Sequence, residues 1–98
     1  MKLFNLEAID SFCRKQERAR KPLYAWKKII ENSEFKSLIE LKNTFRSVDY
    51  IRNDTFCFNI CGNRFRLIVI IIFKHNKAII DKIMTHTEYN KWNKKRRR

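Results

Sequence analysis

The feature that most constrains the fold is the apolar run LIVIIIF, which extends from Leu67 to Phe73. A run of this length is too short to cross a bilayer as a helix, which takes about 20 residues. A short stretch with apolar residues on both faces is typical of a buried strand. Arg64 and Arg66 stand at the start of the same stretch. The run therefore predicts the central strand of a sheet.

Two further strands are predicted beside this one. Residues 55–60 alternate in character, with Phe56 and Phe58 on the side expected to face the helices. Gly62 and Asn63, which include the only glycine of the chain, predict a tight hairpin turn. A second turn at KHNK leads into a third apolar stretch. The predicted strands form an antiparallel meander over Thr55–Ile60, Phe65–Phe73 and Ala78–Thr85.

The N-terminal half has helical periodicity. Apolar residues recur at helical spacing over residues 5–20, and Pro22 stands where a second amphipathic helix would begin. Residues 1–4 are a candidate edge strand, Ser37 and Glu40 have capping-box spacing, and residues 46–54 are interpreted as an ordered loop. The expected fold is a single α+β domain over residues 1–98. Two N-terminal helices lie on one face of the meander, and a short C-terminal helix precedes a disordered basic tail, residues 94–98.

The charge of the chain indicates an anionic partner. Its 98 residues contain 23 Lys and Arg against 10 Asp and Glu, a formal net charge of +13. Self-repulsion disfavours a compact chain with such an excess unless a polyanion relieves it, and nucleic acid is the commonest polyanion. An acidic protein or an anionic membrane surface satisfies the same electrostatics. With no charged-then-apolar leader, we expect a cytoplasmic protein with no membrane association.

The cysteines indicate neither a metal site nor a disulfide. Cys13, Cys57 and Cys61 are odd in number and have no recognised metal-ligand spacing. No cluster of carboxylates suggests a Mg²⁺ site. We therefore expect buried free thiols, no bound metal and no cofactor.

The register of the meander decides whether its polar residues form a site. A two-residue turn at Gly62-Asn63 pairs Asn59 with Arg66. If the second loop has an odd number of residues, Arg66 faces His86 and Ile70 faces Lys82. The residues then sharing one face are Asn59, Arg64, Arg66, Lys82 and His86. An even loop instead places His86 opposite Phe65, on the other face, and the sequence permits both.

The first arrangement would suit cleavage of RNA without a metal. The 2′-hydroxyl of RNA is an internal nucleophile, so the reaction needs a base, cations around the phosphate and an acid for the leaving oxygen. His86 with the two arginines and Lys82 supplies these groups. Tyr89 and Trp92, three residues apart on a helical turn, are placed to stack on unpaired bases.

These segments carry a resemblance to a known family. FNICGNRFRLIVIIIF followed by MTHTEYNKW, after a helical half with SLIELKNTF and VDY, resembles the HigB-type toxins of bacterial toxin–antitoxin modules, within the RelE superfamily. The resemblance implies an mRNA interferase acting on the translating ribosome, and an antitoxin with a helix-turn-helix domain. It also implies a RelE-like fold, with helices on one face of the sheet and the active cleft on the other.

The residues of the family motif are carried over by position. The arginine pair maps to Arg64 and Arg66, and the THxEY element maps to His86, Glu88 and Tyr89. Lys82 is matched by its strand position alone, and Glu88 is expected to cap the helix or orient a neighbour. The predicted catalytic residues are His86, Arg64, Arg66, Lys82 and Tyr89; the predicted RNA-binding residues are Asn59, Trp92, Lys91, Lys94 and Arg96.

Three classes of function remain open at this point. The first is a metal-independent endoribonuclease held in a heterotetramer with a HigA-type antitoxin, acting on mRNA beside ribosomal RNA. The second is a non-catalytic RNA-binding module. The third is a ParE-like toxin that inhibits gyrase, although a pure gyrase inhibitor needs no general base.

Overall fold

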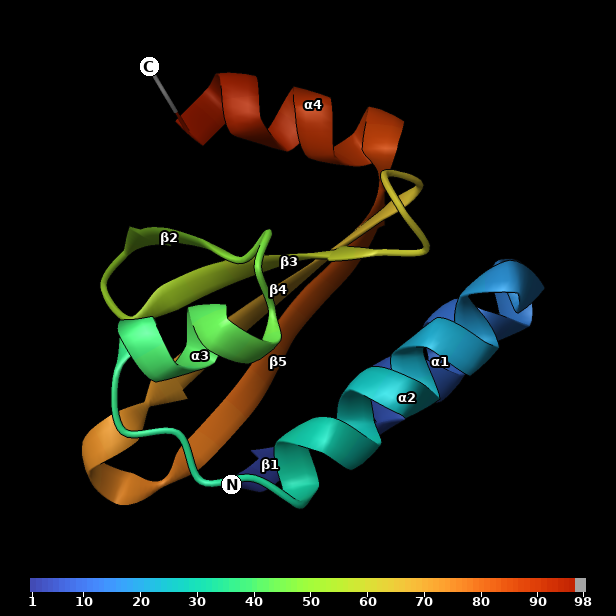
Figure 1. The fold of residues 1–98 in the computed structure, drawn as a ribbon. Helices are drawn as coiled ribbons and strands as arrows, with labels where there is room; N and C mark the ends of the chain where they lie inside the picture. The colour runs from blue at the N-terminus through green and yellow to red at the C-terminus, as the bar shows by residue number, and fades with distance from the viewer. Residues whose placement is uncertain (97–98) are drawn as a thin grey trace.

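The computed structural model describes residues 1–96, and its centre is a five-stranded sheet (Figure 1). The strand order is β1-β5-β4-β3-β2. The strands are β1 (Lys2–Phe4), β2 (Asp49–Arg52), β3 (Thr55–Ile60), β4 (Phe65–Ile72) and β5 (Lys77–Thr85). The helices are α1 (Glu7–Lys15), α2 (Arg20–Glu31), α3 (Leu38–Thr44) and α4 (His86–Arg96), with short 3-10 helices η1 (Glu17–Ala19) and η2 (Phe73–His75). No helix among residues 1–96 is long and apolar enough to span a membrane.

The predicted central strand is confirmed. β4 lies in the middle of the sheet, and its residues Leu67, Ile68 and Val69 are fully buried. The register of its hairpin with β3 is also as predicted, because Asn59 pairs with Arg66. Burial on both faces explains the lack of alternation in the sequence of this strand.

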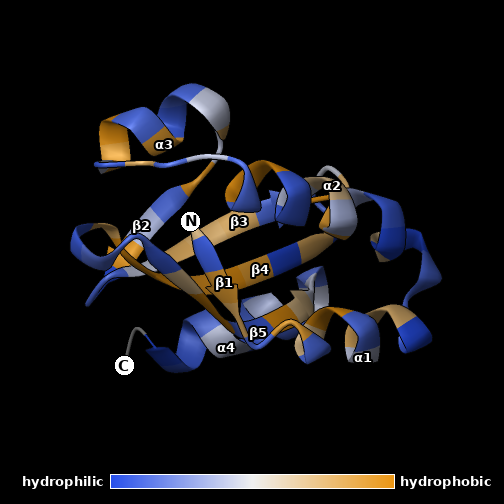
Figure 2. Cartoon of the chain, turned by 90° about the horizontal axis from the view of Figure 1, so that it is seen from below, coloured by the Kyte–Doolittle hydropathy of each residue, from blue (hydrophilic) through white to orange (hydrophobic). Residues whose placement is uncertain are grey.

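The main core lies between one face of the sheet and the N-terminal helices. Phe58 is 2% exposed and meets Trp26 of α2 edge-on, with ring centroids 5.4 Å apart, and Phe45 at 5.1 Å. Phe56 and Ile60 point to the same side and are also buried. β3 and β4 are largely hydrophobic, whereas α1 and α2 alternate between hydrophobic and hydrophilic residues (Figure 2). The prediction that these helices cover the face carrying Phe56 and Phe58 is confirmed.

The sheet is not the purely antiparallel meander that we predicted. The candidate edge strand at the N-terminus forms as β1, but it pairs with β5 in parallel, Leu3 opposite Ala78. The N-terminal ammonium of Met1 donates to the carbonyl of Ile30 at 3.0 Å, which fixes the strand beside the end of α2. The sheet is therefore mixed. The pairing joins residues far apart in the sequence, and local periodicity carries no information about it.

The segment interpreted as a loop contains a strand. β2 pairs antiparallel with β3 through a turn at Asn53 and Asp54, whose φ angles are 49° and 61°. Asn and Asp are the residues other than glycine that best tolerate this left-handed conformation. The two-residue Asn-Asp turn was the available signal for this hairpin. The strand itself has too few buried residues to show a period.

The capping predicted for α3 is confirmed. The Glu40 amide donates to the Ser37 hydroxyl at 3.3 Å, and the Lys36 amide donates to the Glu40 carboxylate at 3.3 Å. The buried residue of this short helix, Leu41, adds to the main core. α3 therefore extends the helical cover toward the β2 edge of the sheet.

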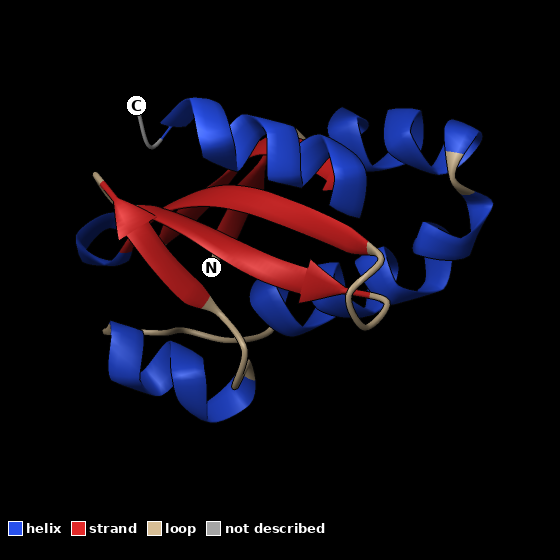
Figure 3. Cartoon of the chain, turned by 90° about the horizontal axis from the view of Figure 1, so that it is seen from above, coloured by secondary structure: helices blue, strands red, loops and turns tan. Residues whose placement is uncertain are grey.

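The C-terminal helix lies where we expected an open cleft. α4 crosses the sheet on the face opposite α1 and α2 (Figure 3). It begins at His86 and continues through Lys94, Lys95 and Arg96, so the first three residues of the predicted disordered tail are helical. Arg97 and Arg98 lie outside the described residues.

The packing of Phe58 predicts a large effect of its removal. Phe58→Ala should lower the free energy of unfolding by about 3–5 kcal/mol, because the ring contacts α2 and the segment after α3 at once. Ile39→Ala, at a side chain 75% exposed, should change it by less than about 0.5 kcal/mol. Urea unfolding followed by circular dichroism measures both. Equal stability losses would contradict this description of the core.

Candidate functional site: a cationic groove at the end of the sheet

The register between β4 and β5 follows neither of the simple alternatives. Four residues, Phe73–Asn76, connect Ile72 to its partner Lys77, which is an even number. Ile68 then pairs with Lys82 while Val69 pairs with Ile80, so Asp81 is an extra residue, a β-bulge. The bulge reverses the effect of the even loop on the side chains that follow it. The pairing predicted between Ile70 and Lys82 is wrong, because Ile70 pairs with Ile79.

The bulge returns the side chains that follow it to the predicted face of the sheet, but it changes the β4 residues with which they pair. Arg66 pairs with Met84, not with His86. The backbone N–H of His86 donates to the carbonyl of Arg64 at 2.9 Å, which places His86 opposite the other arginine of the pair. The predicted contact between Arg66 and His86 is therefore wrong, and the structure brings Arg64 and His86 together.

A capping box fixes His86 at the first position of α4. The Glu88 amide donates to the Thr85 hydroxyl at 3.2 Å, and the Thr85 amide donates to the Glu88 carboxylate at 2.8 Å. This reciprocal pair ends β5 and starts the helix within one residue. Glu88 therefore caps the helix, one of the roles expected for it. The side chain of His86 is exposed at this junction.

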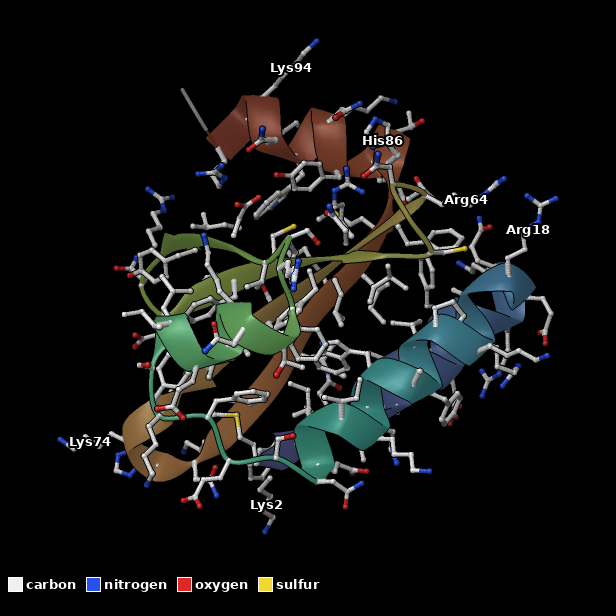
Figure 4. All side chains as sticks on the ribbon, in the orientation of Figure 1. Lys2, Arg18, Arg64, Lys74, His86 and Lys94 are labelled. Carbon is white, nitrogen blue, oxygen red and sulfur yellow. The ribbon has the colours of Figure 1, made fainter. Side chains whose placement is uncertain are left out.

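Arg64 and His86 line an open groove of about 480 Å³. One wall comes from the hairpin tip and the β5–α4 junction, with Arg64, Phe65, Thr85, His86 and Thr87. The other comes from the turn between α1 and η1 together with the ends of both helices that flank it, with Lys15, Gln16, Glu17 and Arg18. Arg18, Arg64 and His86 lie at one end of the molecule, opposite Lys2 and Lys74 (Figure 4). We call this the terminal groove.

The other predicted cations lie beneath α4. The side chain of Arg66 is 9% exposed, and its guanidinium donates to the carbonyl oxygens of Asn63 at 2.9 Å and Phe65 at 3.3 Å. Its charged carbon lies 5.2 Å from the centre of the Tyr89 ring. Such a cation–π contact stabilises the helix against the sheet. Arg66 is thus held inside the structure and does not line the terminal groove.

Lys82 and Arg96 contact one aromatic ring of α4. Both charges lie 5.5 Å from the centre of the Trp92 ring. Beneath the helix, a small apolar cluster of Cys57, Ile68 and Met84 packs against Tyr89 and Trp92. These contacts hold α4 on the sheet, and they engage both rings that were predicted to stack on a base, although each ring remains partly exposed.

Burial also changes the acidity of groups under the helix. It raises the pKa of the Cys57 thiol to about 11, against a smaller opposing effect of Arg66. It raises the pKa of the Tyr89 hydroxyl as well, and the neighbouring Cys57 adds to that shift. Both groups are therefore neutral at physiological pH.

The remaining predicted residues are dispersed. Asn59 is half-buried beside Arg66 in the sheet. Lys91 and Lys94 are exposed, and Lys94 points away from the body of the molecule (Figure 4). Sequence reasoning missed Lys15 and Arg18, because nothing local connects the end of the first helix to a histidine far along the chain.

The terminal groove has the groups needed to act on a phosphodiester. It combines a histidine, the side chain that most often serves as a general acid or base, with three cationic side chains that can bind phosphate oxygens. Among residues 1–96, no three His, Cys, Asp or Glu side chains lie together as a candidate metal site. Cys13 and Cys57 are buried free thiols as expected, whereas Cys61 is only half-buried.

Comparison with known proteins decides the family. The family model of the HigB toxin, described as the RelE-like toxic component of a toxin–antitoxin system, matches residues 19–92. The mRNA interferase toxin HigB of Escherichia coli (strain K12) is 29% identical over 92 residues, covering 92% of this chain and 88% of that protein. The mRNA interferase HigB of Shigella flexneri matches with the same values. The chain belongs to the HigB toxin family.

Membership of the HigB family implies a protein partner for this chain. The toxic component of a toxin–antitoxin system has an antitoxin as its partner. The matched residues include Arg64, Arg66, Lys82, His86, Tyr89 and Trp92, but they begin at Ala19. Lys15 and Arg18 therefore lie just outside the match, although they form one wall of the terminal groove.

The packing of α4 in this HigB-family toxin predicts a pattern of thiol reactivity. At pH 8 only Cys61 should react rapidly with a thiol reagent, because Cys13 is 0% and Cys57 3% exposed. With a pKa of about 11, only about one Cys57 thiol in a thousand is ionised at that pH. Tyr89→Ala should expose Cys57, so that a second thiol reacts rapidly with the reagent.

Tyr50→Ala is the matched control for this experiment. Tyr50 is half exposed and stacks edge-on with Phe56, so it packs on the opposite side of the sheet from Cys57. Tyr50→Ala should leave Cys61 as the one rapidly reacting thiol. Two rapid thiols in the unaltered protein would show that α4 does not cover Cys57.

Proposed function

We propose that this HigB-family toxin is an mRNA interferase, a metal-independent endoribonuclease that acts in the terminal groove. The observation that carries the proposal is the placement of His86 opposite Arg64 at the open end of the sheet. The names of the relatives, mRNA interferase HigB, support the choice of mRNA as the substrate. Both side chains are exposed, so a strand of RNA reaches them without any movement of the fold.

The proposed reaction is a transesterification within the RNA. His86 accepts the proton of the 2′-hydroxyl, whose oxygen attacks the adjacent phosphorus. The bond from phosphorus to the 5′-oxygen breaks, and that oxygen takes a proton from water in the open groove. Arg64 binds the phosphate and interacts more strongly as negative charge accumulates. The products are a 2′,3′-cyclic phosphate and a 5′-hydroxyl.

Arg66, Tyr89 and Lys82 have a positioning role in this proposal. Arg66 is tied to the hairpin that carries Arg64, through its hydrogen bond to Asn63, and it stacks on Tyr89 of the helix that begins at His86. The stack of Lys82 on Trp92 holds the same helix further along. These contacts fix the relative positions of the two groups that meet the RNA.

The partners follow from the same reasoning. We propose a HigA-type antitoxin with a helix-turn-helix domain, assembled with the toxin as a heterotetramer, and cleavage of mRNA on the translating ribosome in the cytoplasm. Asn59, Lys91, Lys94 and Arg96 then serve contacts to RNA beyond the reacting phosphate. The exposure of Lys91 and Lys94 on the outer side of α4 suits ribosomal RNA.

Replacing the histidine tests the chemistry directly. His86→Gln and Arg64→Ala should each slow single-turnover cleavage by about 10²- to 10⁴-fold, the typical contribution of a positioned acid–base or phosphate-binding group. His75→Gln is the matched control, because His75 is exposed at the far end of β5 and should have no effect. Cleavage is followed on ribosomes programmed with a labelled message.

The ends of the RNA products and the effect of a chelator test the mechanism further. Cleavage should persist in EDTA and leave a 2′,3′-cyclic phosphate. Products with 5′-phosphates, or full activity in His86→Gln, would overturn the mechanism. Arrest of DNA replication with intact messages would support a gyrase inhibitor, and RNA binding without cleavage would support a binding module.

A further inference from the structure

We propose that Lys15 and Arg18 form a second phosphate-binding wall, which holds the single-stranded RNA backbone next to the phosphate at His86. The inference rests on the proposed function, because it extends the same groove. It assigns a role to the turn between α1 and η1, which lies outside the segment matched by the family model.

The composition of the groove favours an anionic ligand. Its lining contains three permanent cations and one histidine against a single carboxylate, Glu17. That carboxylate accepts hydrogen bonds from Arg20, at 2.9 Å and 3.3 Å. Within the described part of the chain, no ion pair involves Lys15, Arg18 or Arg64. Three cations therefore face the groove with their charge available to a ligand.

The neighbouring carboxylates are also engaged elsewhere. Asp10 accepts a hydrogen bond from the hydroxyl of Tyr24. Glu88 is held by the Thr85 amide in the capping box. The turn between α1 and η1 thus presents Lys15 and Arg18 to solvent beside carboxylates that already have partners.

The cationic side chains of the groove are divided between its two walls. Lys15 and Arg18 stand on one wall, and Arg64 and His86 on the other. A polyanion with regularly spaced phosphates can contact both walls, so a strand bound at Arg64 and His86 can continue onto the first wall. The lining contains no aliphatic side chain, and its one phenyl ring, that of Phe65, is buried, so the groove offers no exposed apolar side chain as an anchor for an amphipathic protein segment. RNA therefore suits it better than an acidic region of the antitoxin.

The test measures binding of an RNA that cannot be cleaved because its 2′-hydroxyls are replaced by hydrogen. The double variant K15Q/R18Q should bind about tenfold more weakly at moderate salt. The slope of log affinity against log salt should fall by about 1.4, as expected for two lost contacts to a single strand. K15R/R18K, which keeps both charges, should restore most of the affinity. Thermal unfolding checks that the variants are folded.

The matched control is K28Q/K74Q. It removes two charges at exposed residues that do not line the groove. It should change the affinity by less than about twofold. Equal losses in the two double variants would overturn the proposal, because they would show a nonspecific effect of net charge. If K15Q/R18Q bound the RNA normally but failed to capture the antitoxin, the wall would belong to the antitoxin interface and the proposal would also be wrong.

The outcome is separable from the proposed function. If the unaltered toxin cleaves mRNA and K15Q/R18Q binds and cleaves equally well, the second wall is refuted while the nuclease stands. If the unaltered toxin binds RNA without cleaving it, and only K15Q/R18Q binds RNA more weakly, the phosphate wall is supported and the nuclease is refuted.

Discussion

The burial of β4 on both faces is the constraint on which the rest of the structure depends. A strand with Leu67 and Ile68 on opposite sides, both fully buried, needs an apolar layer above and below the sheet. The N-terminal helices supply one layer and α4 supplies the other. Because α4 covers the second face, Arg66 and Lys82 are held under its aromatic residues. The accessible cations at this end of the sheet are Arg64, just before the strand, and Lys15 and Arg18 across the terminal groove.

The bulge at Asp81 determines which residues of β5 and α4 reach the site. Without the extra residue, the even connection after Ile72 would place Lys82 and Met84 among the N-terminal helices. With it, both lie on the α4 face, and the chain leaves β5 with His86 opposite Arg64. The connection itself depends on Asn76, which adopts the left-handed conformation at φ 52°. One irregular residue in a strand therefore decides which arginine meets the histidine.

Local signals predicted the parts of the fold that depend on local interactions. The turn at Gly62 fixed the pairing of Asn59 with Arg66, and Ser37 with Glu40 marked the start of α3. The parallel pairing of β1 was not predictable, because it joins Leu3 to Ala78 across most of the chain. β2 was missed for a different reason: its residues are mostly exposed and have no period, so only the Asn-Asp turn identified it.

The site was predicted in its residue types more accurately than in its geometry. One of the two registers that the sequence permits placed the arginines, Lys82 and His86 at one end of one face. It did not show the bulge, whose cause lies in the pairing of two strands, or the position of α4. Apart from Tyr89 and Trp92, the residues of α4 are polar or charged, so the pattern indicates a solvated helix. Lys15 and Arg18 join the site only through the tertiary structure.

We expect RNA to bind in the terminal groove while α4 stays on the sheet. The most direct test is to map the backbone amide resonances that shift when a 2′-deoxy strand, which cannot be cleaved, is titrated into the toxin. We predict shifts at Gln16, Arg18, Arg64 and His86, with Cys57, Ile68 and Met84 unchanged. Large shifts at those three buried residues, with no shifts at the groove residues, would show instead that the strand displaces α4 and binds Arg66 and Lys82.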